Sequence, residues 1–204
     1  MKYLIHGFQT NIREYEMRDL FGWLLVVTLL HFLAGNFIAR RQVHNDYMRL
    51  IRLGCFSKWW HRLCIQVLCL CLALTAAVFS VSLLSRIMRW GMNLGAALGE
   101  LPLLAFFLFF LNFCFLTTFQ MLVINLEQGE KLSFLLMAVV EVLSLYGGLI
   151  CGEWACWMPG SWKMYCRSDL SVPAGYSVTV IPMIQFLWVA LCCQIGYKWL
   201  DRRR

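Results

Sequence analysis

Long apolar runs separated by short polar segments dominate the pattern of this chain. Five runs reach the roughly 20 residues that a helix needs to cross the hydrocarbon core of a bilayer. Their periodicity does not select a buried face, because a membrane-spanning helix is apolar on all sides, so length carries the prediction. The predicted spans are Leu20–Ile38, Leu63–Leu84, Leu103–Asn125, Leu132–Cys151 and Tyr176–Tyr197.

Two of the connections predict more than simple loops. Residues 40–62 mix Tyr, Leu and Ile with charges, which suits an amphipathic helix lying along the cytoplasmic membrane surface. Residues 152–175 contain Gly, Pro, Trp and Cys and few helix formers, so they predict an external loop. Cys156 could form a disulfide there with Cys166 or with Cys151, while the alternative is that all three remain thiols.

Composition agrees with a membrane protein. Hydrophobic residues make up 61% of the 204 residues and charged residues only 14%, against about 25% charged in soluble domains. Such a chain cannot hide its apolar surface from water. We therefore predict an all-α fold, a polytopic transmembrane bundle of about five spans that forms a single integral membrane domain over residues 1–204.

The distribution of charge predicts the orientation. The net charge is +7, but the basic residues lie between and after apolar runs, so topology and anionic lipid account for them and no nucleic-acid partner is predicted. Eleven Lys and Arg fall on the side that holds residues 39–62 and the C-terminus, against seven on the other. The first side is expected in the cytoplasm, with the N-terminus outside, in a multi-pass protein of the cell membrane.

A few polar residues interrupt the spans. Glu141 is the only carboxylate well inside one, where it costs roughly 2.5–3.5 kcal/mol on insertion, so it is either a polar or proton-handling residue or a hydrogen-bonded packing residue. His31 has no carboxylate nearby in sequence, and a buried polar contact is expected for it. Four amides are expected to act as hydrogen-bonding groups between helices: Asn112, Gln120, Asn125 and Gln185.

No motif points to chemistry within this chain. The ten cysteines include no C-x-x-C pair, and no Walker A, H-E-x-x-H or G-x-S-x-G sequence occurs, so no catalytic residue, metal or cofactor is predicted. A double G-x-x-x-G repeat at residues 91–99 suits either close helix packing or a flexible connection. His61 and Cys64, three residues apart, leave a membrane cysteine peptidase as an alternative.

The connection after the first span carries the most specific pattern. Leu20-Phe-Gly-Trp-Leu-Leu, Ala34-Gly-Asn-Phe-Ile and Met48-Arg-Leu-Ile-Arg-Leu-Gly-Cys-Phe-Ser-Lys-Trp-Trp-His-Arg, with the ending Trp199-Leu-Asp-Arg-Arg-Arg, resemble small permease subunits of type-2 ABC exporters from Gram-positive bacteria. In that family the motif follows the second of six spans, whereas here it follows the first. The resemblance therefore implies that the family's first span is missing and that residues 1–19 match the external loop after it.

The resemblance implies a permease that pairs with a separate cytoplasmic ATPase and with a second permease subunit or another copy of itself. It would move a peptide, an antibiotic or a lipid-like substrate. The basic side chains of the motif would contact the ATPase or lipid phosphates, and its two tryptophans would anchor the segment at the membrane interface. A membrane immunity protein that acts by binding, without transport, is a further alternative. The residues on the motif are Arg49, Arg52, Lys58, Trp59, Trp60 and Arg62.

Overall fold

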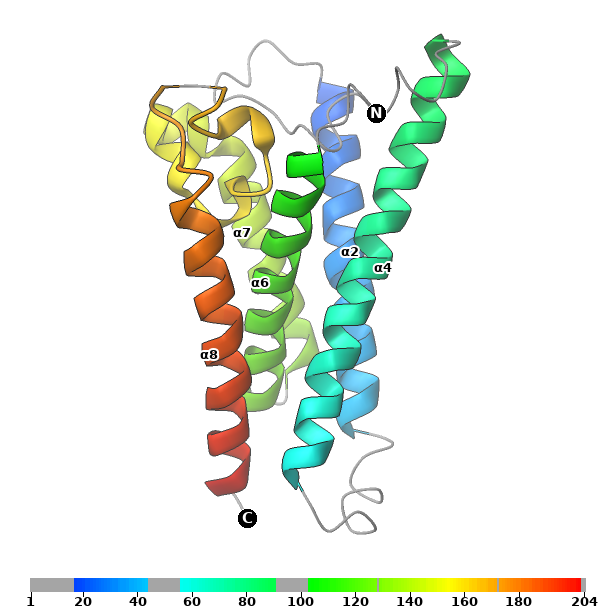
Figure 1. The fold of residues 1–204 in the computed structure, drawn as a ribbon, viewed down its shortest axis with the longest axis vertical. Coiled ribbons are helices and arrows are strands. Elements are labelled where there is room, and N and C mark those ends of the chain that lie inside the picture. Colours follow the sequence, from blue (N-terminus) through cyan, green and yellow to red (C-terminus); the bar gives the residue numbers. More distant parts are fainter. Residues whose placement is uncertain (1–16, 44–55, 91–102, 128, 172, 203–204) are drawn as a thin grey trace.

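Five long helices form an up-and-down bundle in the computed structural model (Figure 1). The structure describes residues 17–43, 56–90, 103–127, 129–171 and 173–202. The helices are α2 (Met17–Val43), α4 (Phe56–Trp90), α6 (Leu103–Glu127), α7 (Glu130–Cys151) and α8 (Val180–Arg202). Three short 3-10 helices follow α7: η2 (Gly152–Trp157), η3 (Pro159–Ser161) and η4 (Tyr165–Arg167).

The all-α prediction is confirmed, and each predicted span coincides with a helix. Within the described residues, three helical stretches are long and apolar enough to cross a membrane: Met17–Arg41, Trp59–Ser85 and Leu103–Ile124. Val180–Ile195 is a shorter apolar stretch, and α7 packs beside α2 and α6. The chain is therefore an all-α protein with the helices of a membrane protein.

Helix α6 lies at the centre of the bundle. It contacts all four other long helices, and 72% of its apolar stretch is buried, against 39% for α2 and 28% for α4. Each outer helix buries one face against α6. In α2 the buried side repeats every three or four residues, as a helix requires, through Leu20, Trp23, Val27, Leu30, Ala34 and Ile38.

Two expected boundaries change. The surface helix predicted over residues 40–62 loses both ends, because α2 continues to Val43 and α4 already begins at Phe56, while residues 44–55 lie outside the described residues. The last span was predicted to start at Tyr176, but α8 starts at Val180. Tyr176 is buried in the preceding segment, where it forms an isolated bridge with Ser168.

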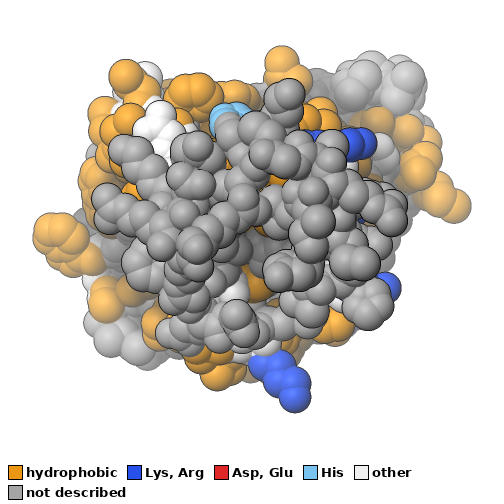
Figure 2. Space-filling view, turned by 90° about the horizontal axis from the view of Figure 1, so that it is seen from below, with side chains coloured by type: hydrophobic (Ala, Val, Ile, Leu, Met, Phe, Trp, Pro, Cys, Tyr) orange, Lys and Arg blue, Asp and Glu red, His pale blue; other side chains and the backbone are white. Residues whose placement is uncertain are grey.

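Basic side chains gather at one end of the bundle. We call the end where α2, α6 and α8 finish and α4 and α7 begin the basic end. Figure 2 looks onto it and shows Lys and Arg side chains at its rim. The charged side chains that the structure describes near this end are all basic: Arg40, Arg41, Arg62 and Lys131. The segment of residues 152–179, which we call the α7–α8 segment, lies at the opposite end (Figure 1).

Candidate functional site

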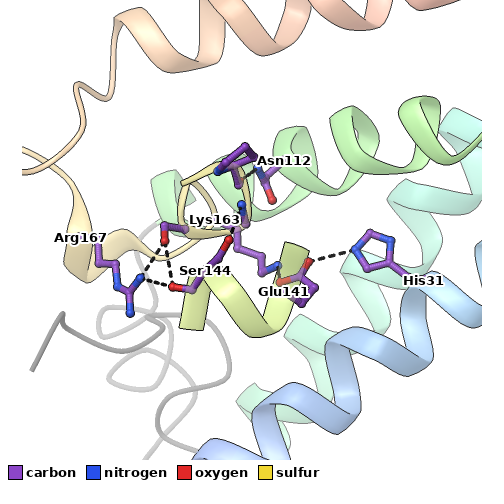
Figure 3. Close-up of polar contacts among 9 residues, drawn as sticks. His31, Asn112, Glu141, Ser144, Lys163 and Arg167 are labelled. Atoms are coloured by element: carbon purple, nitrogen blue, oxygen red, sulfur yellow. Dashed lines mark hydrogen bonds and ion pairs between the residues drawn. The ribbon is translucent and has the colours of Figure 1, made fainter. Parts of the chain in front are cut away.

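A carboxylate, an imidazole and an ammonium group meet inside the bundle. Glu141 of α7 is completely buried, and its Oε1 lies 3.1 Å from Nε2 of His31 on α2. Its Oε2 accepts a hydrogen bond from Nζ of Lys163, which belongs to the α7–α8 segment (Figure 3). Burying a charge is costly unless an opposite charge and hydrogen bonds accompany it. This arrangement, which we call the buried charge centre, supplies both.

Lys163 reaches the centre because the α7–α8 segment folds back into the bundle. Its side chain is only 3% exposed, and the ammonium lies 5.0 Å from the centroid of the Trp23 ring on α2, a cation–π contact. Burial lowers the pKa of Lys163 from its ordinary value, and the carboxylate of Glu141 opposes that shift. The segment is thus held to α7 and α2 by one side chain.

Arg167 makes a second connection between the segment and α7. Its Nη1 donates to the carbonyl oxygen of Ser144 at 2.5 Å and to Oγ of Ser161 at 2.7 Å. Its Nη2 donates to the carbonyl oxygen of Leu145 at 3.3 Å. Oγ of Ser144 in turn accepts from the backbone N–H of Gly160 at 3.0 Å. The buried guanidinium therefore fixes the segment to the backbone of α7 (Figure 3).

The close packing of the segment makes Gly160 a sensitive position. A Cβ there would lie 2.6 Å from Oγ of Ser144 and 3.2 Å from Oε2 of Glu141. We expect Gly160→Ala to lower the free energy of unfolding by about 1–3 kcal/mol, because the segment must move to relieve the overlap. Unfolding in mixed detergent micelles, followed by tryptophan fluorescence, measures the change.

Gly22 offers a matched control, because a Cβ there has nothing within 4 Å. Gly22→Ala lies inside α2 and should be neutral or stabilise by up to about 1 kcal/mol through helix propensity. Equal effects of the two substitutions would contradict the tight packing of Gly160 against α7.

The amides predicted within the spans take different positions. Nδ2 of Asn112 on α6 donates to the carbonyl oxygen of Pro159 at 2.8 Å, so this hydrogen bond joins α6 to the α7–α8 segment. Nε2 of Gln120 donates to the carbonyl oxygen of His31 at 3.2 Å and joins α6 to α2. Gln185 is buried on α8, with no hydrogen-bond partner among the described residues.

Sequence reasoning identified Glu141 but missed its partners. His31 lies 110 positions away along the chain, so no local spacing reveals the contact. Lys163 and Arg167 lie in the segment predicted as an external loop, and both are buried. The available signal was Glu141 itself, because a carboxylate within a span requires a partner.

The residues of the basic motif are only partly described. Arg49 and Arg52 lie outside the described residues, and the side chain of Lys58 is not described. The G-x-x-x-G repeat at residues 91–99 also lies outside the described residues. Arg62 is exposed on α4. Trp59 and Trp60 are buried within the bundle, and their anchoring of the segment at the membrane interface stays a prediction. Nε1 of Trp60 donates to the carbonyl oxygen of Cys193 on α8 at 2.6 Å.

Most of the described cysteines pack within the bundle, while Cys69 and Cys151 are exposed. Cys64, the nucleophile of the peptidase alternative, is buried in the core against which Cys193 packs, while His61 is exposed. No disulfide joins the described cysteines, including the three near the α7–α8 segment. Nor does any group of three or more His, Cys, Asp or Glu within the described parts of the chain form a potential metal site.

The fold and the buried charge centre define a class, an all-α membrane protein with an ion pair inside its bundle. No protein-family model, curated protein or solved structure matches the chain.

Proposed function

We propose that the chain is a permease-like subunit of an ABC-type exporter that works with a separate cytoplasmic ATPase. The observation that supports this proposal most is the position of Trp60. It belongs to the basic motif that resembles type-2 permeases, and its indole fastens the start of α4 to α8. The motif therefore continues directly into a helix long enough to span the membrane.

This arrangement supports a mechanical route from a docked ATPase to the bundle. The basic end offers arginine and lysine side chains, which suit acidic surfaces because guanidinium groups bind carboxylates with two hydrogen bonds. Movement of the motif would shift the start of α4 and, through Trp60, the part of α8 around Cys193. Helix α8 packs along the central helix α6, so the displacement would reach the middle of the bundle.

The other end of the bundle complements this route. Lys163 and Arg167 hold the α7–α8 segment against α7, so that end of α7 and the segment form one unit. Helix α4 is less embedded there: its last buried side chain among the described residues is Ser82, and Met88 is 84% exposed. A helix that is held at the basic end and largely exposed towards the other suits relative movement against a second permease subunit or another copy of the chain, with substrate passing between the two subunits.

Affinity purification of the full chain from native membranes in mild detergent tests the proposal. Quantitative mass spectrometry should identify an enriched cytoplasmic ATPase with a Walker A motif. The triple variant Arg49→Glu/Arg52→Glu/Arg62→Glu should lower its recovery by at least tenfold, because each substitution reverses a charge at the proposed contact.

The control is Arg86→Glu, which changes the same kind of charge at the opposite end of α4. It should leave recovery of the ATPase unchanged. Absence of any associated ATPase, or equal losses in both variants, would contradict the permease proposal and favour a protein that acts by binding alone.

A further inference from the structure

A pocket of about 290 Å³ lies between α2, α6 and α7, towards the basic end. Lys131 is the second residue of α7, so the pocket begins at the level where that helix enters the bundle. Gln120 lies seven residues before the end of α6, about 10 Å deeper at 1.5 Å per residue. The lining residues are Phe32, Gly35, Asn36, Gln120, Lys131 and Phe134.

The polar side of the pocket has the cation of Lys131 and a hydrogen-bond acceptor, Oε1 of Gln120, that has no partner among the described residues. Lys131 is an exposed residue that lines the pocket. Nε of Arg40 donates to Oδ1 of Asn36 at 2.8 Å, so the NH₂ group of Asn36 can donate to a ligand. Gln120 is completely buried and gives its own NH₂ group to His31, while its Oε1 has no hydrogen-bond partner among the described residues. The terminal torsion of Gln is soft, so rotation of the amide would turn Oε1 towards a ligand in exchange for the hydrogen bond to the carbonyl oxygen of His31.

The apolar side of the pocket consists of two phenyl rings. Phe32 of α2 and Phe134 of α7 meet edge to face with centroids 5.6 Å apart. Phe32 is 48% exposed, so the rings lie at the outer surface of the bundle, where lipid chains contact a membrane protein. Gly35 keeps the inner wall open, because a Cβ there would lie 2.3 Å from Nε2 of Gln120.

We propose that this pocket binds an anionic phospholipid whose headgroup carries a hydroxyl, of the phosphatidylglycerol type. The phosphate would accept hydrogen bonds from Lys131 and Asn36, and a headgroup hydroxyl would donate to Oε1 of Gln120. The acyl chains would leave past Phe32 and Phe134. A volume near 300 Å³ is the lower limit for ligand pockets, so it suits a headgroup and not an entire lipid. The proposal does not depend on the ATPase.

Native mass spectrometry of the purified full chain, titrated with single lipids in detergent, tests this site. Phosphatidylglycerol should bind at least tenfold more tightly than phosphatidylcholine, which lacks both the net negative charge and the hydroxyl. Phosphatidylmethanol keeps the charge but has no hydroxyl, and it should bind roughly fivefold more weakly than phosphatidylglycerol, the effect of one hydrogen bond. Equal affinity for all three lipids would overturn the proposal.

Two matched variants locate the site. Lys131→Gln should weaken binding of phosphatidylglycerol roughly fivefold, because one cation near the headgroup is removed. Arg41→Gln removes a cation from α2 at the same end, whose guanidinium lies over the Phe37 ring and does not line the pocket, and it should leave the affinity unchanged. Equal losses in both variants would show general attraction to a basic surface and overturn the site.

Competition with a soluble headgroup separates lipid from free phosphate. Millimolar glycerol phosphate should leave phosphatidylglycerol bound, because it lacks the acyl chains that contact Phe32 and Phe134. Full displacement would show that the pocket takes a soluble phosphate ester and would overturn the lipid assignment.

Discussion

Glu141→Leu is expected to lower the free energy of unfolding by about 3–5 kcal/mol, because it leaves the ammonium of Lys163 buried without its carboxylate. The loss arises mainly from the uncompensated charge and not from the lost hydrogen bonds. Unfolding in mixed micelles, monitored by tryptophan fluorescence, gives the value. Asp19→Asn is the control, since Asp19 is a partly exposed carboxylate at the start of α2 and should change stability by less than about 0.5 kcal/mol.

A double-mutant cycle separates charge from packing. Glu141→Leu/Lys163→Met replaces both charges with apolar side chains, and replacing an entire buried ion pair in this way is often neutral or stabilising. The double variant should therefore be more stable than Glu141→Leu alone by at least about 2 kcal/mol, although His31 loses its partner. A double variant as unstable as the sum of the single variants would mean that the pair contributes nothing beyond side-chain volume.

The sequence predicted the helices better than the faces they bury. Length alone located all five, because a bilayer requires about 20 apolar residues in each span. The buried side of α2 could not be read in the same way. Leu25 and Leu29 are exposed while Val27 and Leu30 are buried, yet all four are apolar because lipid replaces water on the outer side. Hydrophobicity therefore carries no information about which side faces α6.

The α7–α8 segment shows a different limit. Its Gly and Pro residues correctly predict the absence of a long helix, but loops normally lie on the surface, so its cations appeared exposed. The structure instead buries Lys163 against Glu141 and Arg167 against backbone carbonyl groups. These contacts depend on how α7 lies beside the segment, which is a tertiary property. A single carboxylate within a span was the only local indication of them.

Arg167 holds the α7–α8 segment in place, so Arg167→Lys and Arg167→Met should change the reactivity of the neighbouring Cys166 thiol in opposite directions. Burial raises the pKa of Cys166 to about 12, and the adjacent guanidinium of Arg167 opposes that shift. Arg167→Lys should keep the segment in place. Cys166 should then react with maleimide at pH 7.4 at the wild-type rate or up to a few times more slowly, because a lysine is less well placed to lower the pKa of the thiol.

Arg167→Met should instead release the segment, because the carbonyl groups of Ser144 and Leu145 lose their charged donor. Exposure would return the pKa of Cys166 towards its ordinary value near 9, and the reactive thiolate fraction at fixed pH would rise by up to about a thousandfold. Peptide-level mass spectrometry follows each cysteine separately, and Cys151, already exposed at the end of α7, serves as the internal control. Slower labelling of Cys166 in Arg167→Met would mean that the segment stays packed without Arg167, since loss of a nearby cation alone raises the pKa of the thiol further.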